Sequence, residues 1–318
     1  MAVGATSTIV PAGEPSQTGR AARRAPADRW ANRDRRAAVL MLAPNFVLFS
    51  VFIGVPVIGG LLLSFFHWGL VGLPQWAGFQ NYIMLAEDPV VPVAIVNTML
   101  FVAFGVVPTV LLGLLLAVFV NVRVPGIAAL RTLYFIPAVV SFAASALLWE
   151  WVYHPSVGIL DYLLSQLGVD GPAWLSNTTV ALPALAVVAV WLALPVSILL
   201  YMAALQRIPE TVIEAAMLDG AGSYRRLIYV IWPSVRPMTL LVAVVAFLGF
   251  TNGSFDLVNI MTQGGPINAT TTLIYYTYYV AFDNLQLGYA AALAMVQLGI
   301  VLTGLGLARG AQKLLRSP

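Results

Sequence analysis

The chain has 318 residues, of which 60% are hydrophobic and only 9% are charged, and its formal net charge is +3. Soluble domains carry about 25% charged residues, so this composition excludes a soluble protein and indicates a polytopic membrane protein. There is no cysteine and there are two histidines, which excludes disulfides, thiolate catalysis and a cysteine-based metal site.

The first 36 residues are rich in Ala, Gly, Pro, Ser, Thr and Arg and hold few large apolar side chains. Such a segment cannot bury enough apolar surface to offset the entropy lost on ordering. We therefore predict that residues 1–36 form a disordered cytoplasmic tail, whose arginines serve mainly to set the topology.

Six later stretches are long and apolar enough to cross a bilayer, whose hydrocarbon core of about 30 Å requires roughly 20 residues of helix. The first is too long for the apolar region of a signal peptide and lacks a following cleavage site of small residues. The sequence thus predicts an all-α membrane protein with six transmembrane helices in residues 37–310 and a cytoplasmic C-terminus at 311–318. The predicted helices are 39–66, 93–120, 132–153, 179–204, 238–261 and 289–308.

The positive charges predict the orientation of these helices. If six helices alternate, all 16 Lys and Arg residues fall on one side, in the tail, in the second and fourth loops and at the C-terminus. Because cytoplasmic loops carry the excess of Lys and Arg, we expect both termini in the cytoplasm. The other three loops contain no Lys or Arg, and their charged residues are the acids Glu87, Asp88, Asp161, Asp170 and Asp283.

Two outer loops have recognisable features. Residues 67–92 include Trp68, Trp76, Phe79 and Tyr82, and such aromatic residues favour the headgroup boundary of a bilayer. In the next outer loop, apolar residues recur at helical spacing from Ile159 to Leu167. This spacing predicts a short helix on the outer surface.

The fourth loop, residues 205–237, is polar and long for a connection between two spans. A first helix is predicted from Pro209 to Asp219, because proline and an acidic first turn favour a helix start. Gly220 would end it, since glycine follows many helix ends. A loop of this kind typically has a task at the membrane surface.

A second helical piece is predicted over residues 223–231, ended by Pro233 and Pro237. Ala215 and Ala216 keep the first helix thin, so the backbone of another protein can approach closely. The loop mixes acids with bases and has only a narrow apolar face, which favours a protein partner over a lipid surface.

Ionisable groups at membrane depth are costly and are therefore candidate functional groups. Asp256 lies in the fifth predicted helix and shares one face with Asn252 and Asn259. This polar stripe predicts either a hydrogen-bonded seam between helices or the lining of a solute path, and the sequence favours neither. Glu150, near the outer end of the third helix, is interpreted as a charge that reaches water.

The loop segment Glu214-Ala215-Ala216-x-x-Asp219-Gly220-Ala221, with its downstream prolines, resembles the EAA loop of ABC-importer permeases, and more narrowly the carbohydrate-uptake family of maltose and glycerol-phosphate type permeases. It departs from the family pattern at Gly222, Leu227 and Trp232. The resemblance extends over most of residues 37–310 and includes Gly78-Phe-Gln-Asn-Tyr82, Asn97-Thr98, Leu148-Trp-Glu-Trp151, Thr262-Gln-Gly-Gly-Pro266, Ala281-Phe282 and Gly288-Tyr-Ala-Ala-Ala292.

The resemblance implies the transmembrane-domain fold of a type I ABC importer in the plasma (inner) membrane of a bacterium. It implies that Glu214, Ala215, Ala216, Asp219, Gly220 and Ala221 couple the chain to an ATP-hydrolysing subunit. The expected partners are a second, homologous permease that forms a heterodimer, two ATPase subunits, an extracytoplasmic solute-binding protein and the lipid bilayer, and not a nucleic acid.

No catalytic residue, metal site or cofactor is expected in this chain. Lys313 is its only lysine, and no Gly-Lys-Ser/Thr surrounds it, so a Walker A phosphate loop is excluded. ATP and Mg would accordingly be bound by the partner ATPase.

The family comparison also implies substrate contacts. Aligned through the Gly-Gly-Pro motif, Phe250, Thr251 and Ser254 match positions that hold the sugar. On the preceding helix the matching positions are near Trp191, Ala193 and Val196, of which Trp191 is the expected contact. Phe250, Thr251 and Ser254 lie nearly opposite Asn252 and Asp256 on an ideal helix. Both groups can line one path only if the helix breaks at residues 252–254, which Gly253 would permit.

There are two alternative classes of function. A proton-coupled secondary transporter would need a buried acid that titrates, and Asp256 is the only plausible one. An intramembrane enzyme would need paired His/Asp ligands or a Ser/Lys dyad at depth, and the sequence offers neither. The identity of the transported sugar stays open.

Overall fold

The computed structural model describes residues 27–69, 71–121 and 127–316, in two compact units, Met1–Val57 and Ile58–Pro318. In the first unit, α1 (Ala27–Phe49) continues through one π-helical segment, η1 (Ser50–Gly54). The helix therefore begins inside the segment predicted to be disordered, whereas the first membrane-crossing stretch begins at Ala37. Residues 1–26 lie outside the described part of the chain.

Five helices in the described residues are long and apolar enough to cross a membrane: Ala37–Leu63, which ends with α2 (Val55–Leu63), Val90–Val120, Ala181–Leu205, Ser223–Thr262 and Leu287–Lys313. They correspond to five of the six predicted spans. The described part of the chain has a sixth span only if one bent pair of helices counts as one.

That bent pair is α5 (Ile127–Val139) and α6 (Phe142–Val152), whose axes differ by 113°. The span predicted over residues 132–153 is therefore present only as two helices separated by a sharp bend. Pro137 lies in the last turn of α5 and cannot donate a backbone hydrogen bond. Ser141 then starts a new helix, because its side chain accepts a hydrogen bond from the Ala144 N–H (3.2 Å).

The polar loop forms α9 (Glu210–Leu218) and α10 (Ser223–Arg226), close to the predicted bounds. The prediction that Pro233 and Pro237 end the second helix is wrong. The chain instead continues through η2 (Leu227–Ile231) into α11 (Trp232–Leu257) and η3 (Val258–Thr262). Pro233 cannot donate a backbone hydrogen bond, and the π-helical segment η2 immediately precedes the turn in which it lies.

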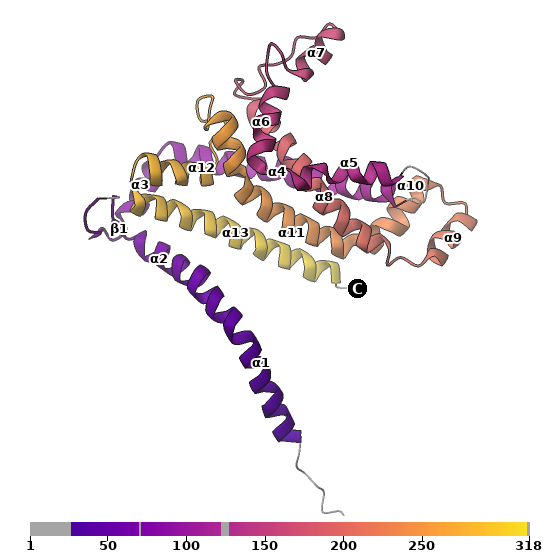
Figure 1. Ribbon diagram of the computed structural model, residues 1–318, viewed down its shortest axis with the longest axis horizontal. Coiled ribbons are helices and arrows are strands. Elements are labelled where there is room, and N and C mark those ends of the chain that lie inside the picture. The colour runs from indigo at the N-terminus through magenta and orange to yellow at the C-terminus, as the bar shows by residue number, and fades with distance from the viewer. Residues whose placement is uncertain (1–26, 70, 122–126, 317–318) are drawn as a thin grey trace, which may run out of the picture. The chain divides into compact units, whose positions relative to one another are not determined.

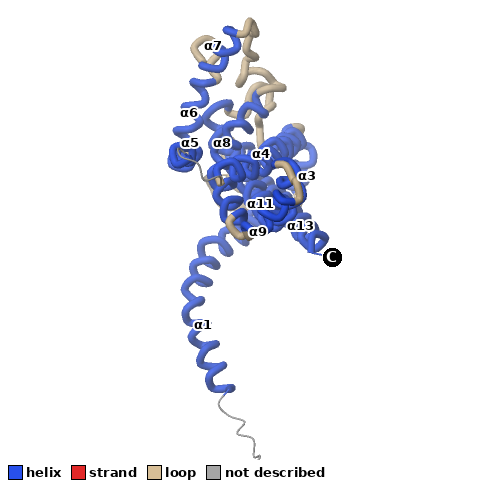
Figure 2. Tube along the Cα trace, turned by 90° about the vertical axis from the view of Figure 1, so that its right-hand side faces the viewer, coloured by secondary structure: helices blue, strands red, loops and turns tan. Residues whose placement is uncertain are grey.

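The core of the second unit is formed by α4 (Val90–Val120), α8 (Ala181–Leu205) and α11, which run side by side with α13 (Leu287–Arg316) (Figure 1). Figure 2 looks almost along these helices and shows them gathered in one bundle. Small residues allow the close approach. Gly113 on α4 faces Ser197 on α8, and a Cβ at this glycine would lie 2.0 Å from the serine oxygen.

Short elements join the span ends. After α2, β1 (Phe66–His67) pairs antiparallel with β2 (Gln75–Trp76), and α3 (Gln80–Glu87) follows. Asn81 fixes this hairpin by donating hydrogen bonds to the carbonyl oxygens of Ser64 and Phe66, at 2.8 and 2.9 Å. The short outer helix predicted at residues 159–167 is present as α7 (Ile159–Gln166).

The loop that contains Gly-Gly-Pro connects η3 with α12 (Leu273–Tyr278) and η4 (Tyr279–Asp283). Asn97 on α4 holds this loop by donating to the carbonyl oxygens of Asn268 (2.8 Å) and Thr271 (3.0 Å). The Asn97-Thr98 pair noted in the sequence thus has a structural role, since the Thr98 hydroxyl also accepts from the backbone N–H of Leu273.

Asp88 links α4, α12 and α13. One carboxylate oxygen accepts hydrogen bonds from the hydroxyls of Tyr276 and Tyr289, and the other accepts from the backbone N–H of Val90 at 2.8 Å. Burial opposes the charged form, but the tyrosine and backbone hydrogen bonds outweigh it and hold the pKa of Asp88 below 3.8. The sequence indicates only that Asp88 is an acidic residue in a loop, and it does not predict these hydrogen bonds.

Candidate functional site

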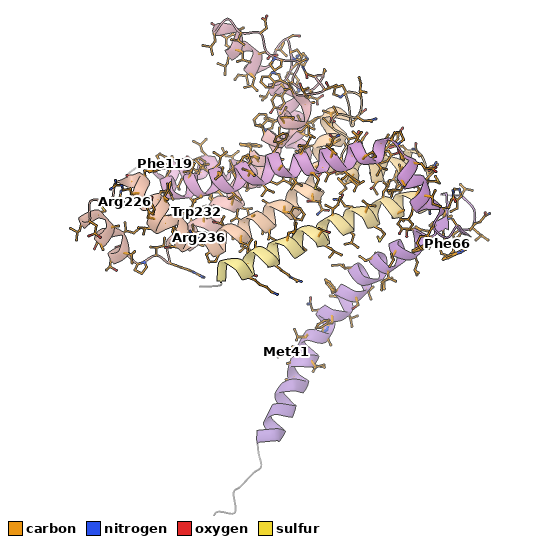
Figure 3. All side chains as sticks on the ribbon, turned by 180° about the vertical axis from the view of Figure 1, so that it is seen from behind. Met41, Phe66, Phe119, Arg226, Trp232 and Arg236 are labelled. Atoms are coloured by element: carbon orange, nitrogen blue, oxygen red, sulfur yellow. The ribbon has the colours of Figure 1, made fainter. Side chains whose placement is uncertain are left out.

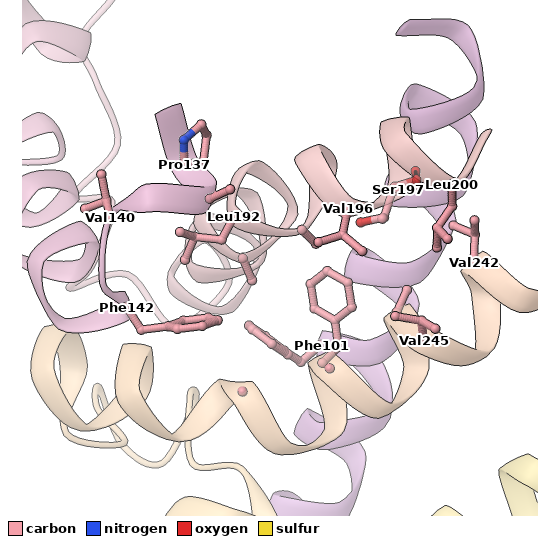
Figure 4. Close-up of a pocket in the computed structure, with 18 residues that line it drawn as sticks. Phe101, Pro137, Val140, Phe142, Leu192, Val196, Ser197, Leu200, Val242 and Val245 are labelled. Atoms are coloured by element: carbon pink, nitrogen blue, oxygen red, sulfur yellow. Dashed lines mark hydrogen bonds between the residues drawn. The ribbon is translucent and has the colours of Figure 1, made fainter. Parts of the chain in front are cut away.

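A pocket of about 330 Å³ lies between the middle of the spans and the bend of α5 and α6 (Figure 4). Three phenylalanine rings and several branched aliphatic side chains form most of its wall. The lining residues are Phe101, Thr109, Pro137, Ala138, Val140, Phe142, Ala189, Leu192, Ala193, Val196, Ser197, Leu200, Val242, Val245, Ala246, Gly249, Phe250 and Gly253.

The polar side chains of this lining are two hydroxyl groups at one end. Ser197 Oγ donates to the carbonyl oxygen of Thr109 (3.1 Å). The Thr109 hydroxyl is buried and has no hydrogen-bond partner among the described residues. A buried hydroxyl without a hydrogen-bond partner is unfavourable, and Thr109 is only 1% exposed.

Of the six predicted substrate contacts, only Phe250 lines the pocket. Ala193 and Val196, which the family comparison also matched, line it as well. Thr251 and Ser254 are fully buried and face away from it. The Thr251 hydroxyl donates to the carbonyl of Phe247 (2.6 Å), and Ser254 donates to Thr272 at 3.2 Å. These two side chains therefore hold α11 against its neighbours.

Asn252 and Asp256 lie on the pocket side of α11. Asn252 follows Gly249 by three residues, and Asp256 follows Gly253 by three residues. Residues three positions apart lie on the same face of a helix, and both glycines line the pocket. Asn252 is exposed and donates to the carbonyl of Leu248, and Asp256 is half-buried. Because α11 is continuous through residues 252–254, the break considered in the sequence analysis does not occur.

Trp191 is half-buried one position before Leu192, and its ring packs against Trp149 at 5.8 Å between centroids. It borders the pocket without lining it. Sequence analysis missed Phe101 and Phe142, which come from α4 and from the start of α6. Their only signal in the sequence is that they are aromatic residues in apolar runs, which holds for many core positions.

A second pocket, of about 410 Å³, lies where the end of α6 meets η3 and the Gly265–Pro266 turn. Glu150 is exposed there. Its neighbours in the lining include Tyr153, His154 and Thr262. Within the described residues, no group of three or more His, Cys, Asp and Glu side chains is placed to hold a metal ion.

The helical knob, defined as residues 210–226, projects at the other end of the bundle (Figure 1). Within the knob, α9 ends in a tight turn. The Ala221 N–H donates to the carbonyl of Ala216 (2.9 Å), and the Gly220 N–H donates to the carbonyl of Met217 (3.0 Å). Gly220 has φ +78°, which a residue with a side chain adopts only with strain.

Most of the predicted coupling residues are exposed on this knob. Glu214, Ala215, Asp219 and Gly220 are exposed, and Ala216 and Ala221 are half-buried. Leu218 is 89% exposed although it is apolar. Figure 3 shows Phe119, near the end of α4, at the same end of the bundle as Arg226, Trp232 and Arg236.

The knob also borders a hollow that Glu214, Tyr224 and Arg226 line. Glu214 therefore faces space beside a tyrosine and an arginine and is not packed into the bundle. An acidic group in this setting is free to meet a cationic group of another molecule. Chemically, the chain thus offers an apolar pocket among its spans and a charged protrusion at one end.

Comparisons with known proteins agree with this arrangement. Residues 98–309 match the family described as binding-protein-dependent transport system inner membrane component. The sulfoquinovosyl glycerol transport system permease protein SmoG of Agrobacterium fabrum is 33% identical over 275 residues, covering 86% of this chain and 89% of the relative. The sn-glycerol-3-phosphate transport system permease protein UgpA of Escherichia coli is 31% identical over 273 residues, with coverages of 85% and 92%.

Among solved structures, a chain of the bacterial alginate ABC transporter in complex with an alginate pentasaccharide-bound periplasmic protein superimposes with a TM-score of 0.78. It is 20% identical, and the match covers 91% of this chain and 98% of that one. This likeness shows the shared fold, which is that of type I ABC-importer permeases. The protein described here belongs to the binding-protein-dependent transport system inner membrane components, the permease family of ABC importers that its EAA-like loop predicted.

Proposed function

We propose that this chain is one of two permease subunits of an ATP-driven importer for a sugar or sugar-like solute. The helical knob carries the proposal: an exposed, tightly capped pair of short helices continues directly into α11, which forms one wall of the pocket. A load applied to the knob therefore acts on the helix that borders the solute path.

The solute class is inferred from two relatives and from the pocket. The permeases of Agrobacterium fabrum and Escherichia coli named above belong to transport systems for sulfoquinovosyl glycerol and sn-glycerol-3-phosphate. The rings of Phe101, Phe142 and Phe250 offer apolar faces against which the C–H face of a sugar can pack. We infer that this chain supplies half of the solute path and a second, homologous permease supplies the other half.

Two ATPase subunits would bind the knobs of the two permeases, with Glu214 pairing with a cationic residue of the ATPase. An extracytoplasmic solute-binding protein would deliver the solute. Closure of the ATPases would draw the knobs together, and rigid movement of the spans would open the cavity to the outside. In this proposal both termini and the knob are cytoplasmic, in a bacterial plasma membrane, which agrees with the placement of Lys and Arg.

The substitution Glu214→Lys tests the proposal in the complete transporter. It should abolish solute uptake and uncouple ATP hydrolysis from transport, while the chain still inserts into the membrane. Uptake by intact cells and ATPase activity of the purified complex are the two measurements.

The matched control is Asp34→Lys, which makes the same charge change outside the knob, in the N-terminal segment that the charge pattern also assigns to the cytoplasmic side. It should transport like the wild type. Full uptake by the Glu214→Lys transporter, or equal loss in both variants, would contradict a docking role for the knob.

A further inference from the structure

The pocket lacks charge. None of the described residues that line it is Lys, Arg, His, Asp or Glu. Its polar side chains are the hydroxyls of Thr109 and Ser197, of which Ser197 already donates to the Thr109 carbonyl. Both hydroxyls are buried, so the pocket offers a solute mainly apolar contact, and it offers no ion pair.

Two acids lie in the helices that contribute to this part of the molecule. Asp256 is half-buried on the helix face of α11 that also carries Gly249 and Gly253. Glu150 is exposed in the second pocket, where α6 meets η3. Each carboxylate raises the electrostatic cost of bringing an anion near these helices.

The sequence also lacks positive charge over the spans and the outer loops. Residues 37–122, 132–206 and 237–308 contain no Lys or Arg. These segments include the spans and the three loops that the charge pattern assigns to the outer side, and those loops carry Glu87, Asp88, Asp161, Asp170 and Asp283. A path lined by one sign of charge concentrates solutes of the opposite sign and repels those of its own.

We propose that the solute is a saccharide without a phosphate, sulfonate or carboxylate group. This inference rests on the proposed function and narrows its solute class. An anionic group in an apolar pocket needs a cationic partner or several strong donors, and the described residues that line this pocket supply neither. The proposal separates this chain from the relatives whose names state a phosphorylated or a sulfonated solute.

The test follows which solutes disappear from the growth medium. The organism that carries this chain is compared with a strain in which the gene is deleted and with the same strain complemented by the wild-type gene. The medium contains mixed neutral saccharides, amino sugars, sugar phosphates, sulfonated sugars and uronic acids, all quantified by mass spectrometry. A solute imported by this protein is depleted several-fold more by the wild-type and complemented strains than by the deletion strain.

Gene-dependent depletion of a neutral saccharide or an amino sugar is the expected result. Gene-dependent depletion of an anionic solute would overturn the inference while leaving the proposed import function standing. If no solute is depleted in a gene-dependent way, the proposed function fails and the inference fails with it. Complementation with the Glu214→Lys gene provides the transport-deficient control.

Discussion

Gly105 on α4 lies directly against the ring of Phe250 on α11, and a Cβ added to this glycine would lie 2.3 Å from the ring. The same ring packs edge-on against Phe101, with 5.9 Å between the centroids. The glycine thus fixes how closely two spans approach, and it fixes the position of a phenylalanine that lines the pocket.

The substitution Gly105→Ala should therefore destabilise the protein and reduce transport. Overpacking of a well-packed core typically costs about 1–3 kcal/mol, and the displaced ring would narrow the pocket. The midpoint of thermal unfolding of the purified protein and the rate of solute uptake measure the two effects. Gly299→Ala in α13 is the control, because a Cβ there meets nothing within 4 Å. An unchanged midpoint in Gly105→Ala would show that α11 can move away without cost.

The turn at the end of α9 should be sensitive to its glycine. With φ +78° at Gly220, an alanine would be forced into the left-handed region, which costs about 1–2 kcal/mol. Gly220→Ala should lower ATPase coupling and uptake while leaving the amount of protein in the membrane unchanged. Gly222→Ala is the matched control, since Gly222 has φ −64° and open space around it. Equal effects of the two substitutions would argue against a role for the turn geometry.

Stability should fall at acidic pH because of Asp88. The folded protein holds the pKa of this carboxyl below its unfolded value of 3.8, so the charged form is stabilised by folding. The contribution is fully present above pH 3.8 and is lost as the pH falls through the folded pKa. Thermal unfolding from pH 6 to pH 3 should show a smaller acid-induced loss in Asp88→Asn than in the wild type. Identical pH profiles would contradict this assignment.

Asp256 separates ATP-driven import from proton-coupled transport. If ATP drives import, Asp256→Asn should retain uptake, and uptake should persist when the proton gradient is collapsed while ATP is maintained. Uptake that stops with the gradient, together with complete loss of transport in Asp256→Asn, would favour the proton-coupled alternative. The measurement is uptake by cells or vesicles in which ATP and the gradient are controlled separately.

The spans and the knob could be predicted from local signals. Hydropathy over about 20 residues locates a membrane helix, and the pair of Glu210 and Gly220 marks the start and the end of α9. Proline predicted helix ends less well than these signals predicted the spans and α9. Pro233 and Pro237 predicted a helix end, yet the helix continues, whereas Pro137 lies just before the sharp bend between α5 and α6. Tertiary packing decides between these outcomes.

The pocket could not be predicted in the same way. Phe101, Phe142 and Phe250 meet from three helices that are far apart in the sequence, and their apolar runs do not distinguish a pocket wall from a core. Thr251 and Ser254 had the chemistry of sugar contacts, but their direction on α11 turns them toward the interior of the bundle. Residue type was visible in the sequence, and the direction of the side chain was not.

The uninterrupted helical segment from Ser223 to Thr262 has a mechanical consequence. Its 40 residues span about 60 Å at 1.5 Å per residue. Such a rod acts as a lever: a tilt of about 5° about one end displaces the other end by about 5 Å. A displacement at Ser223 would thereby be carried along this helix, through the π-helical segments η2 and η3, to the turn that begins at Gln263.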